Sequence, residues 1–164
     1  MIWLCLMAFT AVVRAEELKK TAVLFLPDQI TCKSGGGTNL VGEIGFRWDE
    51  NEPLYLSLRQ SSKAAENDQV LGTITVFDEN GHELDKVIYV TLPPIPNKEV
   101  VVNKNETKRF GIWEMYSAVI FPRPGNYYAI ASFDYGISGG NSVSFTTNKR
   151  WFRVIEEPDN KSRL

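Results

Sequence analysis

Alternation of apolar and polar residues with a period of two runs through most of the chain. In residues 40–48, four large apolar side chains fall on one face of an extended chain: Leu40, Ile44, Phe46 and Trp48. Residues 54–58 follow the same pattern, with three leucines on one face and Tyr55 and Ser57 on the other. Because successive side chains of a β-strand point to opposite faces, this pattern is typical of strands that bury one face. A helical period of 3.6 residues extends over no useful length, so the sequence predicts an all-β fold.

Turn signals divide the rest of the chain into similar runs. Runs rich in β-branched and aromatic residues predict strands at residues 70–77, 84–92, 110–121, 127–135 and 143–155, with a short edge strand at 100–102. Asn80 and Gly81 lie between the first two runs and predict a hairpin, because glycine accepts the positive φ of a tight turn. Eight or nine such strands predict an antiparallel immunoglobulin-like β-sandwich, which we expect to fill residues 16–155 as a single domain.

A tyrosine at the start of the penultimate run adds detail to this fold class. Tyr127 follows the turn residues Pro124 and Gly125. Its position is similar to the tyrosine corner of immunoglobulin-like sandwiches, in which the hydroxyl group bonds back to upstream backbone. Ala129 stands where antibody domains carry a cysteine. Packing must therefore replace the disulfide that joins the two sheets in those domains.

The two ends of the chain differ from this pattern. Residues 2–13 form an apolar run of the length found in secretory signal peptides, and Val13 and Ala15 suit a cleavage site after Ala15. We therefore expect residues 1–15 to be a signal peptide and the mature protein to be periplasmic or secreted, or cytoplasmic if the start is mis-assigned. The sequence has no other run that could span a bilayer, so we expect no stable membrane insertion after cleavage. Residues 156–164 are expected to form a flexible tail.

The scarcity of catalytic and metal-binding side chains narrows the range of functions. The 164 residues include one histidine, His82, and two cysteines, Cys5 and Cys32. They are too few for a closed Cys/His zinc site. His82 follows the turn at Gly81 on a tip that cannot exclude water, which disfavours a catalytic triad. The formal net charge of −2 lacks the basic excess that nucleic acids require. We therefore predict a protein that is not an enzyme, with no cofactor and no nucleic-acid partner.

Four short segments occur in an order that matches a known family. They are residues 39–45, the Pro-Leu strand of residues 53–58, the Asp-x-x-Gly turn of residues 78–81 and the Phe-Pro-x-Pro-Gly-x-Tyr motif of residues 121–127. In this order the chain resembles an uncharacterised bacterial family of immunoglobulin-like β-sandwiches, over roughly residues 21–155. The resemblance implies the fold and no activity, since turn and core motifs say nothing about chemistry.

Acidic turns give a first group of candidate site residues. If the strands follow the variable-type order, these turns share one end of the sandwich, where their oxygen atoms could bind Ca²⁺. The candidate ligands are Asp49, Glu50, Glu52, Asp78 and Glu79. A solvated acidic tip is the alternative, and the sequence favours it.

Aromatic residues give a second group. An exposed aromatic ring on a sheet face can stack on a sugar or contact a protein, whereas a buried ring only fills the core. The candidates are Tyr55, Trp113, Tyr128 and Trp151. The leading hypothesis is an exported, non-catalytic immunoglobulin-like domain that binds an unidentified protein or glycan partner, or has a structural role. The alternative is a carbohydrate-binding module that uses these aromatics, and a Ca²⁺-binding adhesion-type domain or an enzyme is less favoured.

Overall fold

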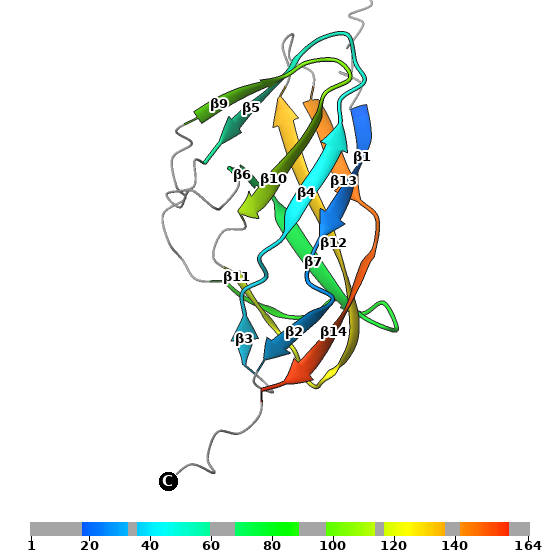
Figure 1. Cartoon of the computed structure of the whole chain (residues 1–164). Helices are drawn as coiled ribbons and strands as arrows, with labels where there is room; N and C mark the ends of the chain where they lie inside the picture. Colours follow the sequence, from blue (N-terminus) through cyan, green and yellow to red (C-terminus); the bar gives the residue numbers. More distant parts are fainter. Residues whose placement is uncertain are drawn as a thin grey trace, which may run out of the picture.

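The computed structural model describes residues 18–32, 36–59, 68–88, 98–113, 117–136 and 142–157. These residues form fourteen β-strands and no helix (Figure 1). The first seven strands are β1 (Leu18–Phe25), β2 (Gln29–Cys32), β3 (Gly37–Thr38), β4 (Glu43–Arg47), β5 (Leu54–Leu58), β6 (Gln69–Leu71) and β7 (Thr73–Asp78). The others are β8 (Lys86–Ile88), β9 (Lys98–Val102), β10 (Thr107–Trp113), β11 (Ser117–Ile120), β12 (Gly125–Gly136), β13 (Ser142–Thr147) and β14 (Arg150–Glu156). Within the described ranges, no helix is long and apolar enough to cross a membrane.

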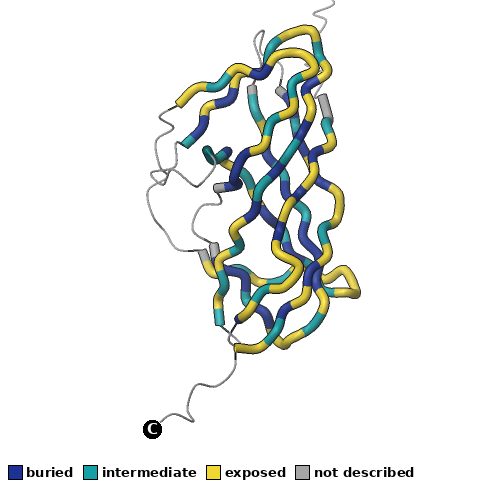
Figure 2. Tube along the Cα trace, in the orientation of Figure 1, coloured by how far each residue is buried: buried dark blue, intermediate teal, exposed yellow. Residues whose placement is uncertain are grey.

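The strands form one large sheet and two small ones. Nine strands make a continuous sheet in the order β2-β14-β12-β13-β1-β4-β10-β6, with β7 paired to β12. Strands β3, β11 and β8 form a second sheet, and β5 and β9 a third. The all-β prediction is therefore confirmed for the described residues, and Figure 2 shows buried and exposed residues alternating along the strands.

Strand β1 joins the two halves of the large sheet. Its first part, from Leu18 to Ala22, pairs in parallel with β13, and its last three residues pair antiparallel with β4. The two halves then face each other across the core. The ring of Phe46 on β4 lies 4.5 Å from that of Phe145 on β13, between centroids, and 6.1 Å from that of Phe133 on β12. The described chain is thus a β-sandwich with its core between two facing layers.

The predicted inward faces agree with the structure. The side chains of Ile44, Phe46 and Trp48 are buried, and so are the three leucines of β5. On β12, every second residue from Tyr127 to Phe133 is buried in the same core. The hydroxyl of Tyr127 donates a hydrogen bond to the carbonyl oxygen of Arg123 at 2.7 Å, as the sequence predicted.

The prediction of a purely antiparallel sandwich with eight or nine strands is wrong in two respects. Three strand pairs are parallel: β1 with β13, β10 with β6 and β14 with β2. The strands are also more numerous, because three predicted runs are each divided and β2 and β3 lie where no strand was predicted. Residues 70–77 contribute to both β6 and β7, residues 110–121 to both β10 and β11, and residues 143–155 to both β13 and β14. Alternation reports which face of a run is buried, and it does not report whether the two ends of the run pair with the same neighbour.

The predicted hairpin around Gly81 forms, but it is much shorter than the sequence predicts. Gly81 has the expected positive φ of 89°, so the turn itself forms. Across the turn, the backbone N–H of Asp78 donates to the carbonyl oxygen of His82 and that of Leu84 to the carbonyl oxygen of Val76, and Phe77 and Glu83 form an isolated bridge. Strand β7 pairs along its whole length with β12, and β8 pairs with β11. The return segment therefore pairs with β7 only next to the turn, and residues 89–92 of the predicted return strand lie outside the described residues.

Both predicted end segments fall mainly outside the described residues. This is true of the whole expected signal peptide and of residues 158–164. The first two residues of the expected tail are ordered into the fold. Glu156 pairs with Cys32 at the end of β14, and the backbone N–H of Glu157 donates to the carbonyl oxygen of Cys32 at 2.9 Å.

Candidate functional site

Three aromatic side chains form a row on the outward face of the sandwich. Tyr128 on β12 is in register with Phe77 on β7 on one side and with Trp151 on β14 on the other. Each neighbouring ring centroid lies 5.0 Å from that of Tyr128. We call Phe77, Tyr128 and Trp151 the outer aromatic row. Its exposed end is Trp151, which keeps 49% of its surface in water.

The row covers its own middle member. Tyr128 alternates with the inward residues of β12, yet it is only 7% exposed. Phe77 stacks on it at an interplanar angle of 15°, and the Nζ atom of Lys149 lies 4.4 Å from its ring centroid. Such contacts fix the position of Tyr128, and the Tyr128 ring in turn supports one side of the Trp151 indole.

A hollow of about 350 Å³ opens beside Trp151. Its lining residues come from four separate segments of the chain: Asp28, Glu79, Asn126, Trp151, Phe152 and Arg153. We call this feature the Trp151 hollow. Asn126 and Arg153 pair in register between β12 and β14, two residues from the pair of Tyr128 and Trp151 and on the same face of the sheet. The strand pairing therefore sets a polar pair directly beside an aromatic pair.

The polar residues of the Trp151 hollow differ in their contacts. Asp28 accepts a hydrogen bond from Nη2 of Arg150 at 2.6 Å, so its charge is balanced. The side chains of Glu79, Asn126 and Arg153 make no hydrogen bond or ion pair with any residue that the structure describes. The Glu79 carboxylate accepts hydrogen bonds, the Arg153 guanidinium donates them, and the Asn126 amide does both. The hollow can thus offer both donors and acceptors to a ligand.

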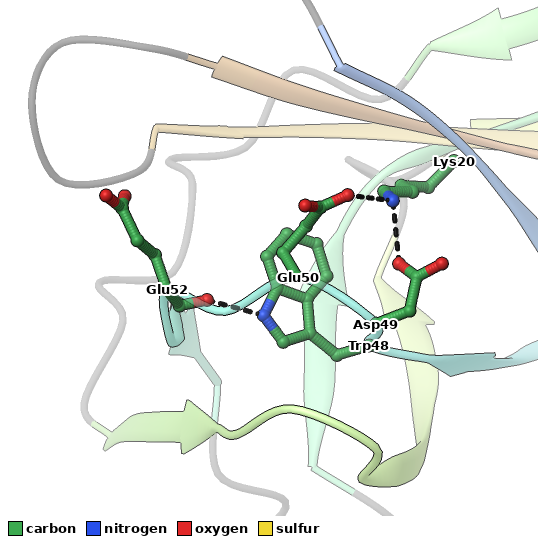
Figure 3. Close-up of polar contacts among 5 residues, drawn as sticks. All are labelled: Lys20, Trp48, Asp49, Glu50 and Glu52. Carbon is green, nitrogen blue, oxygen red and sulfur yellow. Dashed lines mark hydrogen bonds and ion pairs between the residues drawn. The ribbon is translucent and has the colours of Figure 1, made fainter.

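The candidate Ca²⁺ ligands after β4 have other partners. The Nζ atom of Lys20 donates to Asp49 at 2.7 Å and also to Glu50 (Figure 3). These hydrogen bonds raise the pKa of Lys20, and the bond from Lys20 lowers the pKa of Asp49. Figure 3 shows the carboxylate of Glu52 apart from the other two, while its carbonyl oxygen accepts from Nε1 of Trp48 at 2.7 Å. Lys20 therefore already occupies the position between Asp49 and Glu50 that a cation would take.

The remaining candidate Ca²⁺ ligands lie elsewhere. Asp78 ends β7 and Glu79 follows it, and the end of β7 points away from the end of β4 (Figure 1). Oδ1 of Asp78 accepts the backbone N–H groups of Asn80 and His82, and the bond from His82 is the main cause of a lowered pKa. Among the described residues, no group of three or more His, Cys, Asp or Glu side chains could hold a metal ion. The structure does not bring the five acids together.

The four candidate aromatics also have different outcomes. Trp151 is exposed, as a binding residue must be, but Tyr128 is covered by its two neighbours in the row. Tyr55 is 42% exposed on β5, in a sheet separate from the one that carries Trp151. Trp113 ends β10, and its side chain is outside what the structure describes. The structure thus joins Trp151 to Tyr128 and does not join them to Tyr55.

Sequence reasoning missed three polar residues of the hollow: Asp28, Asn126 and Arg153. The sequence spacing could have identified two of them, Asn126 and Arg153. Asn126 lies two residues before Tyr128, and Arg153 two residues after Trp151. Residues at this spacing share one face of a strand, so both belong beside the aromatic pair. Asp28 precedes β2 in a loop, where alternation predicts nothing.

Neither residue considered as a nucleophile or base lies in the hollow. Cys32 is a free, buried cysteine, and burial, followed by the charge of Glu156, raises the pKa of its thiol. A thiol held protonated is a weak nucleophile. His82 is exposed in its turn and lies 3.1 Å from the carboxylate of Asp78, measured from Nδ1. The described residues therefore offer no activated nucleophile beside Trp151.

Comparison with known proteins finds no relative of this chain. No family model matches the chain, and neither a curated protein nor a solved structure matches it. The family resemblance seen in the four sequence segments stays a prediction, and the function must be argued from the geometry of the site.

Proposed function

We propose that the chain is an exported, immunoglobulin-like β-sandwich domain that binds a ligand at the Trp151 hollow without transforming it. The observation that carries the proposal is the half-exposed Trp151 side chain beside three polar side chains that have no partner among the described residues. Leaving so large an apolar ring in water forgoes burial energy, which a ligand would recover by covering the ring. Tyr128 holds the indole in position before binding, which reduces the entropy cost of association.

Two features of the fold support the immunoglobulin-like part of the proposal. Strand β1 pairs with both layers, so it closes one side of the sandwich as a shared edge strand. The bond from Tyr127 to the carbonyl of Arg123 has the pattern of a tyrosine corner. The four sequence segments that resemble the bacterial family of immunoglobulin-like β-sandwiches point to the same fold as these two features. The apolar run of residues 2–13 supports export.

The absence of catalysis is supported by the state of the titratable groups around the hollow. Asp28 is neutralised by Arg150, and Glu79 stands alone on a turn open to solvent. Acid–base catalysis needs a positioned pair of groups and a site that limits water. The two carboxylates of the hollow, Asp28 in an ion pair and Glu79 on an exposed turn, do not form such a pair. The hollow therefore suits binding better than bond cleavage.

Affinity capture with matched variants tests this proposal. The wild-type chain, Trp151→Ala and Tyr55→Ala are immobilised and exposed to the envelope extract and the culture medium of the source organism. Tyr55 is the matched control, because its ring is exposed to a similar degree on another sheet. We expect one component to be retained by the wild type and by Tyr55→Ala, lost by Trp151→Ala, and released with unchanged mass. Retention by all three proteins, or by none, would contradict the proposal.

A further inference from the structure

We infer that the ligand of the Trp151 hollow is an uncharged carbohydrate, with one sugar ring stacked on the Trp151 indole. This inference rests on the function proposed above and adds the chemical class of the ligand. It draws on three properties of the hollow: its flat apolar side, its mixture of hydrogen-bonding groups and its balance of charge.

The flat side of the hollow fits the apolar face of a sugar ring. One face of a pyranose presents several C–H groups, which carry slight positive charge. The π face of an indole is negative, so the two surfaces attract each other while both leave water. Tyr128 supports Trp151 from one side only, at an interplanar angle of 51°, and half of the indole stays accessible. A rigid, half-free ring is the surface that such stacking needs.

The polar side of the hollow fits sugar hydroxyls. Each hydroxyl group both donates and accepts hydrogen bonds, so it is best satisfied where donors and acceptors stand together. Glu79 only accepts, Arg153 only donates, and Asn126 does both. An apolar peptide side chain in the same place would leave these groups without partners, which is unfavourable once water is displaced.

The charges of the hollow favour a neutral ligand. The unpaired charges are those of Glu79 and Arg153, which are opposite, and Asp28 is balanced by Arg150. A sulfated or phosphorylated ligand would gain from Arg153 and lose from Glu79. Neither sign is therefore selected, and binding of the correct ligand should depend little on salt.

Soluble polysaccharides test the inference directly. The probes are neutral xylan, mixed-linkage β-glucan, mannan and chitin oligomers, with alginate and heparin as polyanions. We expect the full chain to bind at least one neutral probe, with an affinity that changes less than about twofold between 0.05 and 0.5 M NaCl. Trp151→Ala should weaken binding at least about tenfold, and Asn126→Ala several-fold, since stacking contributes more than one hydrogen bond. Tyr55→Ala should bind like the wild type.

Asn126→Ala also guards against a folding artefact, because it removes only a side chain that has no described partner. Loss of binding in Trp151→Ala alone, with Asn126→Ala and wild type equal, would contradict the role given to the polar side of the hollow. Binding that is confined to alginate or heparin and is lost at 0.5 M NaCl would overturn the inference of a neutral ligand.

A chemical treatment of the captured material separates this inference from the function it rests on. Periodate cleaves the bond between two adjacent sugar carbons that each carry a free hydroxyl group, whereas protease cleaves polypeptides. Trp151-dependent retention that periodate removes and protease leaves intact supports a carbohydrate. Trp151-dependent retention that protease removes and periodate leaves intact overturns the carbohydrate and keeps the binding function. Retention that does not depend on Trp151 overturns both.

Discussion

Two groups of aromatic side chains, one facing the core and one facing outward, are packed very differently. The inner group fills the core and no member is more than 4% exposed: Phe46, Trp48, Phe133 and Phe145. In the outer aromatic row, Tyr128 is in contact with its two aromatic neighbours and with Lys149, and the row ends on the half-exposed Trp151. Strand β12 contributes to both groups, with Phe133 facing inward and Tyr128 facing outward.

The difference shows that aromatic residues in this fold can either stabilise the core or form an exposed surface. In the inner group each ring is enclosed by both layers, so its whole apolar surface contributes to stability. In the outer row only one layer lies beneath the rings, and a second covering surface is missing at Trp151. Stability should therefore depend strongly on the inner group and weakly on the exposed end of the outer row, whereas binding should show the reverse dependence.

The largest effect is expected in the inner group. Phe145 is fully buried and its ring stacks on Phe133, with centroids 4.5 Å apart. Phe145→Ala should lower the free energy of unfolding by about 3–5 kcal/mol, because it removes apolar burial and leaves a cavity. Urea denaturation measures this loss. Val23→Ala, at a residue 48% exposed on β1, serves as control and should change stability little. A loss below about 1.5 kcal/mol for Phe145→Ala would mean that the core collapses around the gap.

A smaller effect on stability is expected at the exposed end of the outer row. Trp151→Ala removes one cross-strand aromatic contact and uncovers Tyr128, so it should cost about 1–2 kcal/mol and leave the protein folded. Acrylamide quenching of tryptophan fluorescence should show that the variant has lost an accessible component, whereas the buried Trp48 contributes a shielded one. A destabilisation as large as that of Phe145→Ala would show that the row is a structural element and not a binding surface.

Sequence reasoning could predict the inward faces and could not predict the pairing of strands. The alternation around Phe46 and in β5 depends only on neighbouring residues, and it correctly assigned the buried sides. The pairing of β7 with β12 joins segments far apart in the sequence, whereas the local turn at Gly81 predicts only the short pairing next to it. The parallel pairing of β1 with β13 joins residues more than a hundred positions apart, for which a local pattern holds no information.

The site was predictable only in part, for a related reason. Trp151 was a candidate, but Asn148 and Lys149 interrupt the alternation before it, so its direction could not be read from the sequence. Tyr128 was expected on the surface, and its outward direction is correct. Its burial comes from Phe77 and Trp151 on other strands, which no local pattern can reveal.

Tyr127 allows a finer comparison, because it precedes Tyr128 and faces the opposite side. Its hydroxyl group bonds the carbonyl of Arg123, and its ring meets Phe121 edge-on with centroids 5.1 Å apart. Tyr127→Phe keeps the ring and removes the bond, so the free energy of unfolding should fall by about 1 kcal/mol. Tyr55→Phe is the matched control and should change nothing measurable. Equal stability of Tyr127→Phe and wild type in urea would show that water replaces the bond at no cost.

The smallest effect is expected in the turn beside the outer row, and it concerns pH. The pKa of Asp78 is lowered in the folded state, chiefly by the backbone N–H of His82. A lowered folded pKa stabilises the protein above the unfolded value, near 3.8, and this contribution disappears as the pH falls through the folded value. Asp78→Asn keeps an oxygen acceptor but removes the charge.

The variant should therefore be slightly less stable than the wild type at pH 7, and the difference should shrink as the pH falls below about 4. Urea denaturation of both proteins from pH 7 to pH 2.5 measures the difference. Taking the difference is essential, because Asp49 and Glu106 also have lowered pKa values and add their own acid dependence to both proteins. A gap that stays constant over this range would show that the Asp78 carboxylate contributes through shape and hydrogen bonding, which Asn reproduces imperfectly, and not through its charge.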